Sequence, residues 1–437
     1  MEISLNIPKK VETTITLPTS KSISNRALLI QALCPEQRYD IAHLAVCDDT
    51  EHMQQGIEAK RAGAPLINIG ATGTAMRFLT AYLAITPGET VLTGSERMQQ
   101  RPIKILVEAL RALGADISYT RHEGYPPLRI VGKSLRGGKV EVEAGISSQY
   151  ISALLMIGPC LTDGLTLHLK GTIASRTYIE LTLDLMRHYG ATAEWADKQT
   201  IRIAPGGYTD RPLTVEGDWS GASYWYELAA LAAHCGHEVE ILLKGLTADS
   251  KQGDRIVAKI FEQLGVTTEY IEEGARLRNC QLSKLRISES KGCLQAIPSG
   301  ATSTELIANC PLEMDFSHCP DIAQTLAVTC CQLDVPFTFS GIHSLRIKET
   351  DRVAALITEL SKLGYVLRAE GNELLIWDGE RTEPSLHPTI ATYDDHRMAM
   401  AFAPAALYHE GLTIENPEVV TKSYPGYWED LSKLNVK

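Results

Sequence analysis

The feature that most constrains the fold of this chain is a recurring pattern: a helix-like stretch ends at a glycine, and an extended segment follows. Apolar residues at helical spacing precede each glycine, and apolar and polar residues alternate after it, as in a strand. Glycine is suited to the end of a helix because it adopts the left-handed conformation without steric cost. The pattern occupies residues 106–119, 181–195, 256–270 and 356–370, with turn glycines Gly114, Gly190, Gly265 and Gly364.

The spacing of these glycines predicts the number of structural units. Successive glycines are separated by 76, 75 and 99 residues, and the longest step contains the polar segment 288–302, which we expect to be an inserted loop. Dividing 437 residues by six gives about 73 residues for each unit. Six units of alternating helix and short strand would therefore fill the chain in an α/β architecture. Chance similarity between helix ends would give the same pattern.

Composition restricts the class of protein. With 44% apolar and 22% charged residues, the chain has the composition of a globular protein, and no run of about 18 apolar residues is present to span a membrane. Its net charge of −11 opposes binding to nucleic acid or anionic lipid. The absence of a signal-peptide pattern and the ten scattered cysteines, with no Cys-x-x-Cys pair, are typical of a reducing cytoplasm. A structural zinc site near Cys310, His318 and Cys319 is an alternative use of these thiols.

Basic and hydroxyl side chains recur at predicted helix starts, first in the segment 17–33. Ser20 is a candidate N-cap, and Lys21 and Ser22 fall in the first helical turn. Arg26 lies four residues after Ser22, on the same side of the helix. Cations near a helix N-terminus are locally unfavourable unless an anion is bound there. We therefore interpret this segment as an anion site, with a capped helix and two solvated bases as the alternative.

The glycine-rich segment 68–84 carries Gly70, Gly73, Thr74 and Arg77 at the start of a further predicted helix. Its glycines allow a ligand to approach the backbone closely, and Thr74 is a candidate cap. The segment lacks both the glycine pattern of dinucleotide sites and the Lys-Ser/Thr pair of the nucleotide-binding loop. Neither of those functions follows, and an ordinary turn is the alternative.

Further helix starts are polar, although each alone could be an ordinary cap. Arg97 and Arg101 precede a helix that is predicted to begin at Pro102. Two more starts carry neutral hydroxyl and amide donors, which suit a hydroxylated and phosphorylated ligand: Ser147, Ser148 and Gln149, and then Ser175, Arg176, Thr177 and Tyr178.

Carboxylates accompany the bases in the second half of the chain. In the segment 345–356, Glu349 lies among bases at the start of a helix with one apolar face. It is either a catalytic carboxylate or part of a solvated, salt-bridged face. Asp395, His396 and Arg397 precede a nearly all-apolar helix, and Asp321 stands at a helix start where a simple cap is the alternative. Together the bases could line one cationic cavity for two anionic substrates: Lys21, Arg26, Arg77, Arg101, Arg346, Lys348, Arg352, Arg397 and Lys422.

These motifs occur in an order that resembles the 5-enolpyruvylshikimate-3-phosphate synthase family. The strings SKSISNRAL, TGTAMR, RMQQRPI, SSQYISALL, LRIKETDR, DDHRMAM and TKSYP follow one another over nearly the whole chain. The resemblance implies an α/β fold of two similar domains, each built from three βαβαββ units in an inside-out, barrel-like arrangement, with the active site in the cleft between them. It also implies an N-terminal domain at 20–237, with the motifs for shikimate 3-phosphate, and a C-terminal domain at 238–437, completed by 1–19, with the catalytic motifs and those for phosphoenolpyruvate.

The resemblance further implies transfer of the enolpyruvyl group of phosphoenolpyruvate to the 5-hydroxyl of shikimate 3-phosphate, through a tetrahedral intermediate, by a cytoplasmic monomer without metal or organic cofactor. Shikimate 3-phosphate would contact Lys21, Ser22, Arg26, Ser147, Ser148, Gln149, Ser175, Tyr178, Asp321 and Lys348. Phosphoenolpyruvate would contact Lys21, Gly73, Thr74, Arg101, Gln149, Arg352, Arg397 and Lys422. Asp321 would accept the hydroxyl proton, and Glu349 and Lys21 would transfer protons at the methylene carbon.

Three positions depart from the family pattern. Ala71 and Ser344 occupy positions that are commonly Asn, and Thr177 replaces a frequent Pro. The first two put single hydrogen bonds in doubt rather than the reaction. Gly73 leaves room beside the phosphoenolpyruvate pocket, as in glyphosate-sensitive members of the family, so we expect glyphosate to inhibit the chain.

Other functions fit these motifs less well. The sister transferase that acts on UDP-N-acetylglucosamine opens with a Lys-Asn motif and uses a loop cysteine, whereas this chain has SKSISNR and no cysteine in a matching motif. A non-catalytic anion-binding protein would have no use for Asp321 and Glu349 among the bases. Nucleic-acid binding is disfavoured by the acidic charge and by the lack of interleaved aromatic residues.

Overall fold

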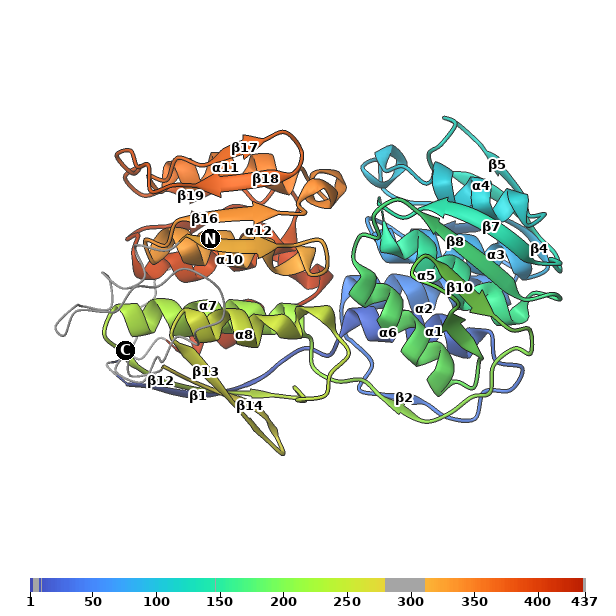
Figure 1. The fold of residues 1–437 in the computed structure, drawn as a ribbon, viewed down its shortest axis with the longest axis horizontal. Helices are drawn as coiled ribbons and strands as arrows, with labels where there is room; N and C mark the ends of the chain where they lie inside the picture. The colour runs from blue at the N-terminus through green and yellow to red at the C-terminus, as the bar shows by residue number, and fades with distance from the viewer. Residues whose placement is uncertain (3–7, 9, 146, 280–310, 435–437) are drawn as a thin grey trace. The chain divides into compact units, whose positions relative to one another are not determined.

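The computed structural model describes residues 1–2, 8, 10–145, 147–279 and 311–434. Backbone contacts divide the chain into two compact units (Figure 1). Unit A comprises Thr19–Glu216, and unit B comprises Met1–Pro18 together with Gly217–Lys437. The chain therefore begins in unit B, passes through unit A and returns to unit B. The segment 288–302, with the expected inserted loop, lies outside the described residues.

The division between the units falls at residues 216–217 rather than at the expected 237–238. Helix α7 (Trp219–His234) accounts for the difference, because its almost fully buried surface belongs to the core of unit B. The same core contains the inward side chains of β1 (Lys10–Thr16) and β12 (Glu238–Lys244). These two strands pair in parallel, so the first strand of the chain completes a sheet of unit B.

The helices of unit A are α1 (Lys21–Ala32), α2 (Asp48–Arg61), α3 (Gly73–Ile85), α4 (Lys104–Ala112), α5 (Ser148–Ile157) and α6 (Arg176–His188). Its first sheet has the order β3 (Leu66–Asn68), β4 (Gly88–Thr93), β6 (Leu128–Gly132) and β5 (Asp116–Tyr119). The second has the order β7 (Gly138–Glu143), β8 (Leu165–Lys170), β10 (Thr200–Ile203) and β9 (Ala193–Trp195). A two-stranded parallel pair joins β2 (Ile41–Ala42) to β11 (Leu213–Thr214).

Among the described residues, the remaining helices of unit B are α8 (Val257–Gln263), α10 (Ala323–Gln332), α11 (Arg352–Lys362), α12 (His396–Phe402) and α13 (Tyr427–Ser432). One sheet has the order β1, β12, β14 (Gly274–Asn279) and β13 (Val266–Ile271). The other has the order β15 (Leu312–Asp315), β16 (Phe337–Ser340), β18 (Leu374–Trp377) and β17 (Arg368–Glu370). A short parallel pair joins β19 (Thr389–Ile390) to β20 (Thr413–Ile414).

The four-stranded sheets share one topology, which confirms the repeat predicted from the glycine pattern. In each sheet the first two strands are parallel and the other two pairings are antiparallel, as the order βαβαββ requires. The turn glycines follow α4, α6, α8 and α11 with φ of 97°, 88°, 87° and 90°, in the left-handed region: Gly114, Gly190, Gly265 and Gly364. Within the described residues, the two other helix pairs, α1–α2 and α12–α13, accompany only two-stranded pairings.

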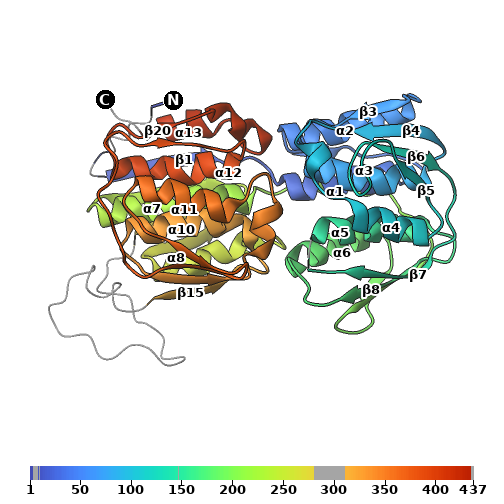
Figure 2. The same cartoon turned by 90° about the horizontal axis from the view of Figure 1, so that it is seen from above.

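Each unit has its own hydrophobic core, formed by helices that pack together under the sheets. In unit B, α10 packs against both α7 and α12, and these helices lie between the two four-stranded sheets (Figures 1 and 2). In unit A, α3 and α5 pack together and are almost wholly buried.

Candidate active site

The start of α1 in unit A holds two predicted cations with different surroundings. Lys21 Nζ donates to Asp49 Oδ2 at 3.1 Å, and both side chains are largely buried. Arg26 lies beneath the first turn and donates through Nη1 to the backbone oxygen of Ser22 at 2.9 Å. Asp49, on α2, was not predicted, because its position in the sequence is that of an ordinary acidic residue in a first helical turn.

Arg26 connects three helices of unit A. Its Nε donates to Thr182 Oγ1 on α6 at 2.7 Å, and its Nη2 donates to Ser152 Oγ on α5 at 3.1 Å. Its guanidinium lies 5.7 Å from the centre of the Tyr178 ring. Burial lowers the pKa of Arg26 to about 10. These contacts are neutral, so they solvate the guanidinium without cancelling its charge, which favours an anion nearby.

The glycine-rich segment forms a second group of contacts at the start of α3. Arg77 Nη1 donates to the backbone oxygen of Gly73 at 3.0 Å, and Gln149 Nε2 donates to Thr74 Oγ1 at 3.1 Å. A Cβ atom at Gly73 would lie 2.8 Å from Arg101 Nη1 and 2.9 Å from Arg77 Nη1. Motifs that are far apart in the sequence therefore meet around Gly73 and Thr74, and a side chain at Gly73 would require the two guanidinium groups to move.

The starts of α5 and α6 carry the predicted hydroxyl and amide donors. Ser147 caps α5, and its Oγ accepts from the backbone N–H of Gln149 at 3.3 Å. Ser148 and Ser175 are both buried. Ser175 has a φ of 53°, a left-handed conformation that is uncommon for serine, and its carbonyl accepts from the backbone N–H of Tyr178 at 3.0 Å. Strained residues of this kind concentrate at functional sites.

In unit B, Arg352 is the centre of a cluster of carboxylates. Its Nε donates to Asp395 Oδ2 at 2.7 Å, its Nη1 to Asp321 Oδ1 at 3.2 Å, and its Nη2 to Glu349 Oε2 at 3.1 Å. The arginine side chain is only 2% exposed. Burial alone would lower the pKa of Arg352, but the charges of Asp395, Glu349 and Asp321 outweigh it and raise this pKa above its ordinary value.

Three more predicted cations contact the carboxylates of this cluster. Lys348 Nζ lies 3.5 Å from Asp321 Oδ1, and Arg397 Nη2 lies 3.0 Å from Asp321 Oδ2. Lys422 Nζ lies 2.7 Å from Glu349 Oε1. Both candidate catalytic carboxylates are thus bound by cations from separate segments of unit B.

Asp254 is a further carboxyl group beside this cluster, and sequence reasoning missed it. Ser220 Oγ donates to Asp254 Oδ2, and the carboxyl group is buried. Burial, together with the nearby charge of Asp321, raises the pKa of Asp254 to about 7, whereas Arg397 opposes the shift. Its sequence context, a Gly-Asp turn before an apolar helix, is that of a simple cap, so no local signal could have found it.

Two local predictions are wrong. Thr74 is not a cap, because α3 begins one residue before it and Thr72 precedes the helix. The helix predicted to begin at Pro102 begins two residues later, after a 3₁₀ turn that ends just before Arg101. Arg346, which the sequence analysis grouped with the other bases, pairs with Asp351 at 3.1 Å.

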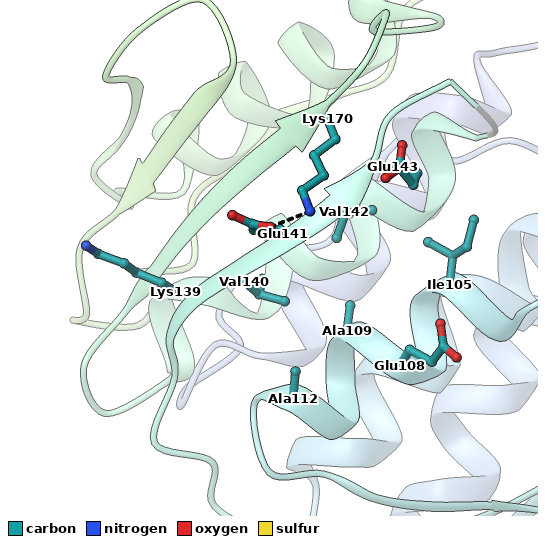
Figure 3. A pocket seen from close by; sticks show the side chains of 10 residues that line it. All are labelled: Ile105, Glu108, Ala109, Ala112, Lys139, Val140, Glu141, Val142, Glu143 and Lys170. Atoms are coloured by element: carbon teal, nitrogen blue, oxygen red, sulfur yellow. Dashed lines mark ion pairs between the residues drawn. The ribbon is translucent and has the colours of Figure 1, made fainter.

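A separate cavity of about 550 Å³ lies in unit A between α4 and β7 (Figure 3). Val140 and Val142 contribute apolar surface to it, and an ion pair of 2.5 Å joins Lys170 to Glu141 at its edge. No predicted site residue lines this cavity. The chemistry-bearing residues of unit A are gathered instead at the starts of α1, α3, α5 and α6.

No group of three or more His, Cys, Asp or Glu side chains in the described part of the chain is arranged to hold a metal ion. Of the residues considered for zinc, Cys310 lies outside the described residues. None of the helices that the structure describes combines the length and apolarity needed to cross a membrane.

The fold defines the class of protein. A solved structure of EPSP synthase from Acinetobacter baumannii matches with a TM-score of 0.73 and 20% identity, and the match covers 100% of this chain and 98% of that one. The enolpyruvyl transferase NikO from Streptomyces tendae matches with a TM-score of 0.68 and 16% identity, over 99% of this chain and 97% of that one. The fold is therefore that of the enolpyruvyl transferases.

Sequence comparison identifies the family within this class. The family model of EPSP synthase (3-phosphoshikimate 1-carboxyvinyltransferase) matches residues 5–63 and 55–431. A 3-phosphoshikimate 1-carboxyvinyltransferase of Bacteroides fragilis is 51% identical over 433 residues, which are 99% of this chain and 98% of that protein. The enzyme of the same name from Photobacterium profundum is 36% identical, with 99% of each chain covered. The chain belongs to the EPSP synthase (3-phosphoshikimate 1-carboxyvinyltransferase) family.

Proposed function

We propose that this chain transfers the enolpyruvyl group of phosphoenolpyruvate to the 5-hydroxyl of shikimate 3-phosphate and releases phosphate, as a step of the shikimate pathway. Family membership supports the activity, as do the relatives of that name that cover nearly the whole chain. One structural observation carries the chemistry: Asp321 and Glu349 are both held by the buried Arg352. This arrangement supports a role for Asp321 as proton acceptor and for Glu349 as a second acid/base group, among cations that suit two anionic substrates.

In this proposal, unit A supplies the donors for shikimate 3-phosphate. Hydroxyl groups and free backbone N–H groups at a helix start bind phosphate well, because the positive end of the helix dipole adds to the hydrogen bonds. Lys348, in unit B, serves a ring hydroxyl of the same substrate. The residues assigned to shikimate 3-phosphate in unit A are Lys21, Ser22, Arg26, Ser147, Ser148, Gln149, Ser175 and Tyr178.

Phosphoenolpyruvate carries a phosphate and a carboxylate, so its proposed partners in unit B are two arginines and a lysine. Arg352, Arg397 and Lys422 would exchange part of their present contacts with Asp321 and Glu349 for contacts with the substrate. Arginine suits this role because its planar fork matches both anionic groups. In unit A, the same substrate would be bound by Lys21, Gly73, Thr74, Arg101 and Gln149.

Asp321 is the proposed base for the 5-hydroxyl. Lys348, Arg352 and Arg397 lie within 3.5 Å of its oxygens and orient the carboxylate that would accept the proton. The hydroxyl oxygen would attack C2 of phosphoenolpyruvate while the methylene carbon gains a proton, which gives a tetrahedral ketal phosphate. Loss of a methyl proton and departure of phosphate would then restore the double bond.

Glu349 and Lys21 are the proposed groups for the proton transfers at the methylene carbon. Glu349 is bound by Lys422 at 2.7 Å and by Arg352 at 3.1 Å, so in this arrangement it is an acceptor rather than a donor of protons. Binding of phosphoenolpyruvate would draw these cations away, because the substrate brings its own negative charge. That exchange would let Glu349 take up a proton during the reaction cycle.

A phosphate-release assay tests the activity. The chain is mixed with phosphoenolpyruvate and shikimate 3-phosphate together, with each alone, and with phosphoenolpyruvate and UDP-N-acetylglucosamine. Release is expected only from the first mixture. No release there, or release with the nucleotide sugar instead, contradicts the proposal. The monomeric state and the cytoplasmic location stay predictions, and analytical ultracentrifugation measures the first.

A further inference from the structure

The loop that joins β19 to α12 contains two consecutive residues in the left-handed conformation. Tyr393 has a φ of 55°, and Asp394 has a φ of 56°. For residues other than glycine this conformation is uncommon, and for a bulky side chain such as tyrosine it is a clear outlier. Two such residues in succession persist only where the surroundings hold them, and Asp395 follows directly.

A buried carboxylate holds this loop. Glu359, on α11, is fully buried and accepts from the hydroxyl of Tyr393 at 2.6 Å. It also accepts from the backbone N–H of Ala391 at 2.9 Å and from Lys362 Nζ at 2.6 Å. Lys362 Nζ donates in addition to the backbone oxygen of Thr389 at 2.8 Å. The loop is therefore fastened to α11 by several hydrogen bonds, two of them to a single glutamate.

The residue after the strained pair orients one of the arginines assigned to phosphoenolpyruvate and caps the helix that carries another. Asp395 accepts from Arg352 Nε at 2.7 Å and from Arg352 Nη2 at 3.3 Å. Its Oδ1 also accepts from the backbone N–H of Arg397 at 3.0 Å, which caps α12. Arg352 and Glu359 stand on the same helix, so the loop is bound to α11 at two points: Tyr393 at Glu359 and Asp395 at Arg352.

We propose that Tyr393 and Glu359 are positioning residues for phosphoenolpyruvate binding, because their hydrogen bond holds the strained turn that places Asp395 against Arg352 and Arg397. The inference rests on the proposed function, and neither residue touches the reacting atoms. Without the hydrogen bond, the turn lowers its free energy by relaxing toward an ordinary backbone conformation. Asp395 would then shift, and the guanidinium of Arg352 would lose its orientation.

The test is Tyr393→Phe in the full chain, assayed by phosphate release. Phenylalanine removes one hydroxyl, and Glu359 keeps its donors Ala391 and Lys362, so the buried carboxylate stays satisfied. We expect the KM for phosphoenolpyruvate to rise about tenfold, which corresponds to about 1.4 kcal/mol. The KM for shikimate 3-phosphate and kcat should stay within about threefold of the native values. Tyr408→Phe is the matched control, because it removes a hydroxyl that donates to the backbone oxygen of Leu231 in the same unit.

A double-mutant cycle with Glu359→Gln separates positioning from a general loss of stability. If the hydrogen bond carries the effect, the two substitutions together raise the KM for phosphoenolpyruvate by less than the product of their separate effects. Independent, multiplicative effects overturn the proposal. So does an unchanged KM in Tyr393→Phe, even if its melting temperature falls. If Glu359→Gln fails to fold, the KM for phosphoenolpyruvate of Tyr393→Phe alone still tests the proposal. A native chain that releases no phosphate refutes the proposed function itself, which is a distinguishable result.

Discussion

Replacement of Arg352 by lysine tests the carboxylate cluster of unit B most directly. Arginine reaches Asp395, Asp321 and Glu349 with three different nitrogen atoms, at 2.7, 3.2 and 3.1 Å. Lysine has the same charge but a single nitrogen, so it can serve only one of these carboxylates well. The substitution therefore removes geometry while it keeps charge.

The contacts that remain determine the size of the effect. Asp321 keeps Lys348 and Arg397, and Glu349 keeps Lys422. Asp395 loses its guanidinium partner, so the new lysine should move toward it and leave the other two carboxylates. Breaking a buried ion pair costs about 3–5 kcal/mol, and the remaining partners place this variant near the lower end, at about 3 kcal/mol.

Thermal unfolding and steady-state kinetics measure the consequences. A loss of about 3 kcal/mol lowers the melting temperature of a unit of this size by about 6–12 °C. Because lysine cannot match the planar anion-binding fork, kcat/KM for phosphoenolpyruvate should fall by about 100-fold or more. Arg368→Lys is the control: Arg368 is half exposed in the same unit, and its ion pairs should contribute less than about 1 kcal/mol.

Two results would refute this reasoning. A variant with a native melting temperature would mean that the three contacts of Arg352 contribute nothing to stability. A destabilised variant with a native KM for phosphoenolpyruvate would mean that Arg352 serves only the fold, and that the substrate is bound by other residues.

Three further predictions follow from the geometry. In Gly73→Ala, the new methyl group would lie 2.8 Å from Arg101 Nη1, so the guanidinium must move. The KM for phosphoenolpyruvate should therefore rise about tenfold, with little change in melting temperature. An unchanged KM would contradict the assignment of Gly73 to the phosphoenolpyruvate site. In Glu349→Gln, turnover should fall by about 100-fold to 10,000-fold while both substrates still bind in calorimetry, and the exposed Glu373→Gln should keep native turnover. The pKa of Asp254 is raised to about 7, so its protonated form adds stability at low pH that is lost as the pH rises toward and through 7. The melting temperature of the native chain should therefore fall from pH 5 to pH 8 more steeply than that of Asp254→Asn, and equal slopes would exclude this group as the cause.

Local rules explain what could be predicted about the fold. The turn glycines could be predicted because a helix that ends in the left-handed conformation favours glycine there. All four have the predicted conformation, as Gly114 and Gly364 illustrate with φ of 97° and 90°. The repetition of helix and strand was thus visible in the residues, whereas the βαβαββ order of each unit was implied only by the family resemblance. The division of the units at 216–217 could not be read in this way, because it depends on which core buries α7.

The candidate site was only partly visible in the sequence. Lys21, Arg352 and Arg397 stood out because bases at helix starts are unusual, and the family motifs contain them. Asp49 and Asp254 were missed, since a carboxylate at a helix start is the commonest cap and carries no further signal.

The sequence by itself determined which chemical groups are present and on which elements they stand, because capping, periodicity and motif order are local properties. Only the tertiary structure decided which of these groups interact. Arg352 binds carboxylates at 321, 349 and 395, whereas the nearby Arg346 pairs with Asp351 and takes no part in that cluster. The energy of a charge depends on the distances to its neighbours and on their burial, and both are set by packing between segments that are remote in the chain.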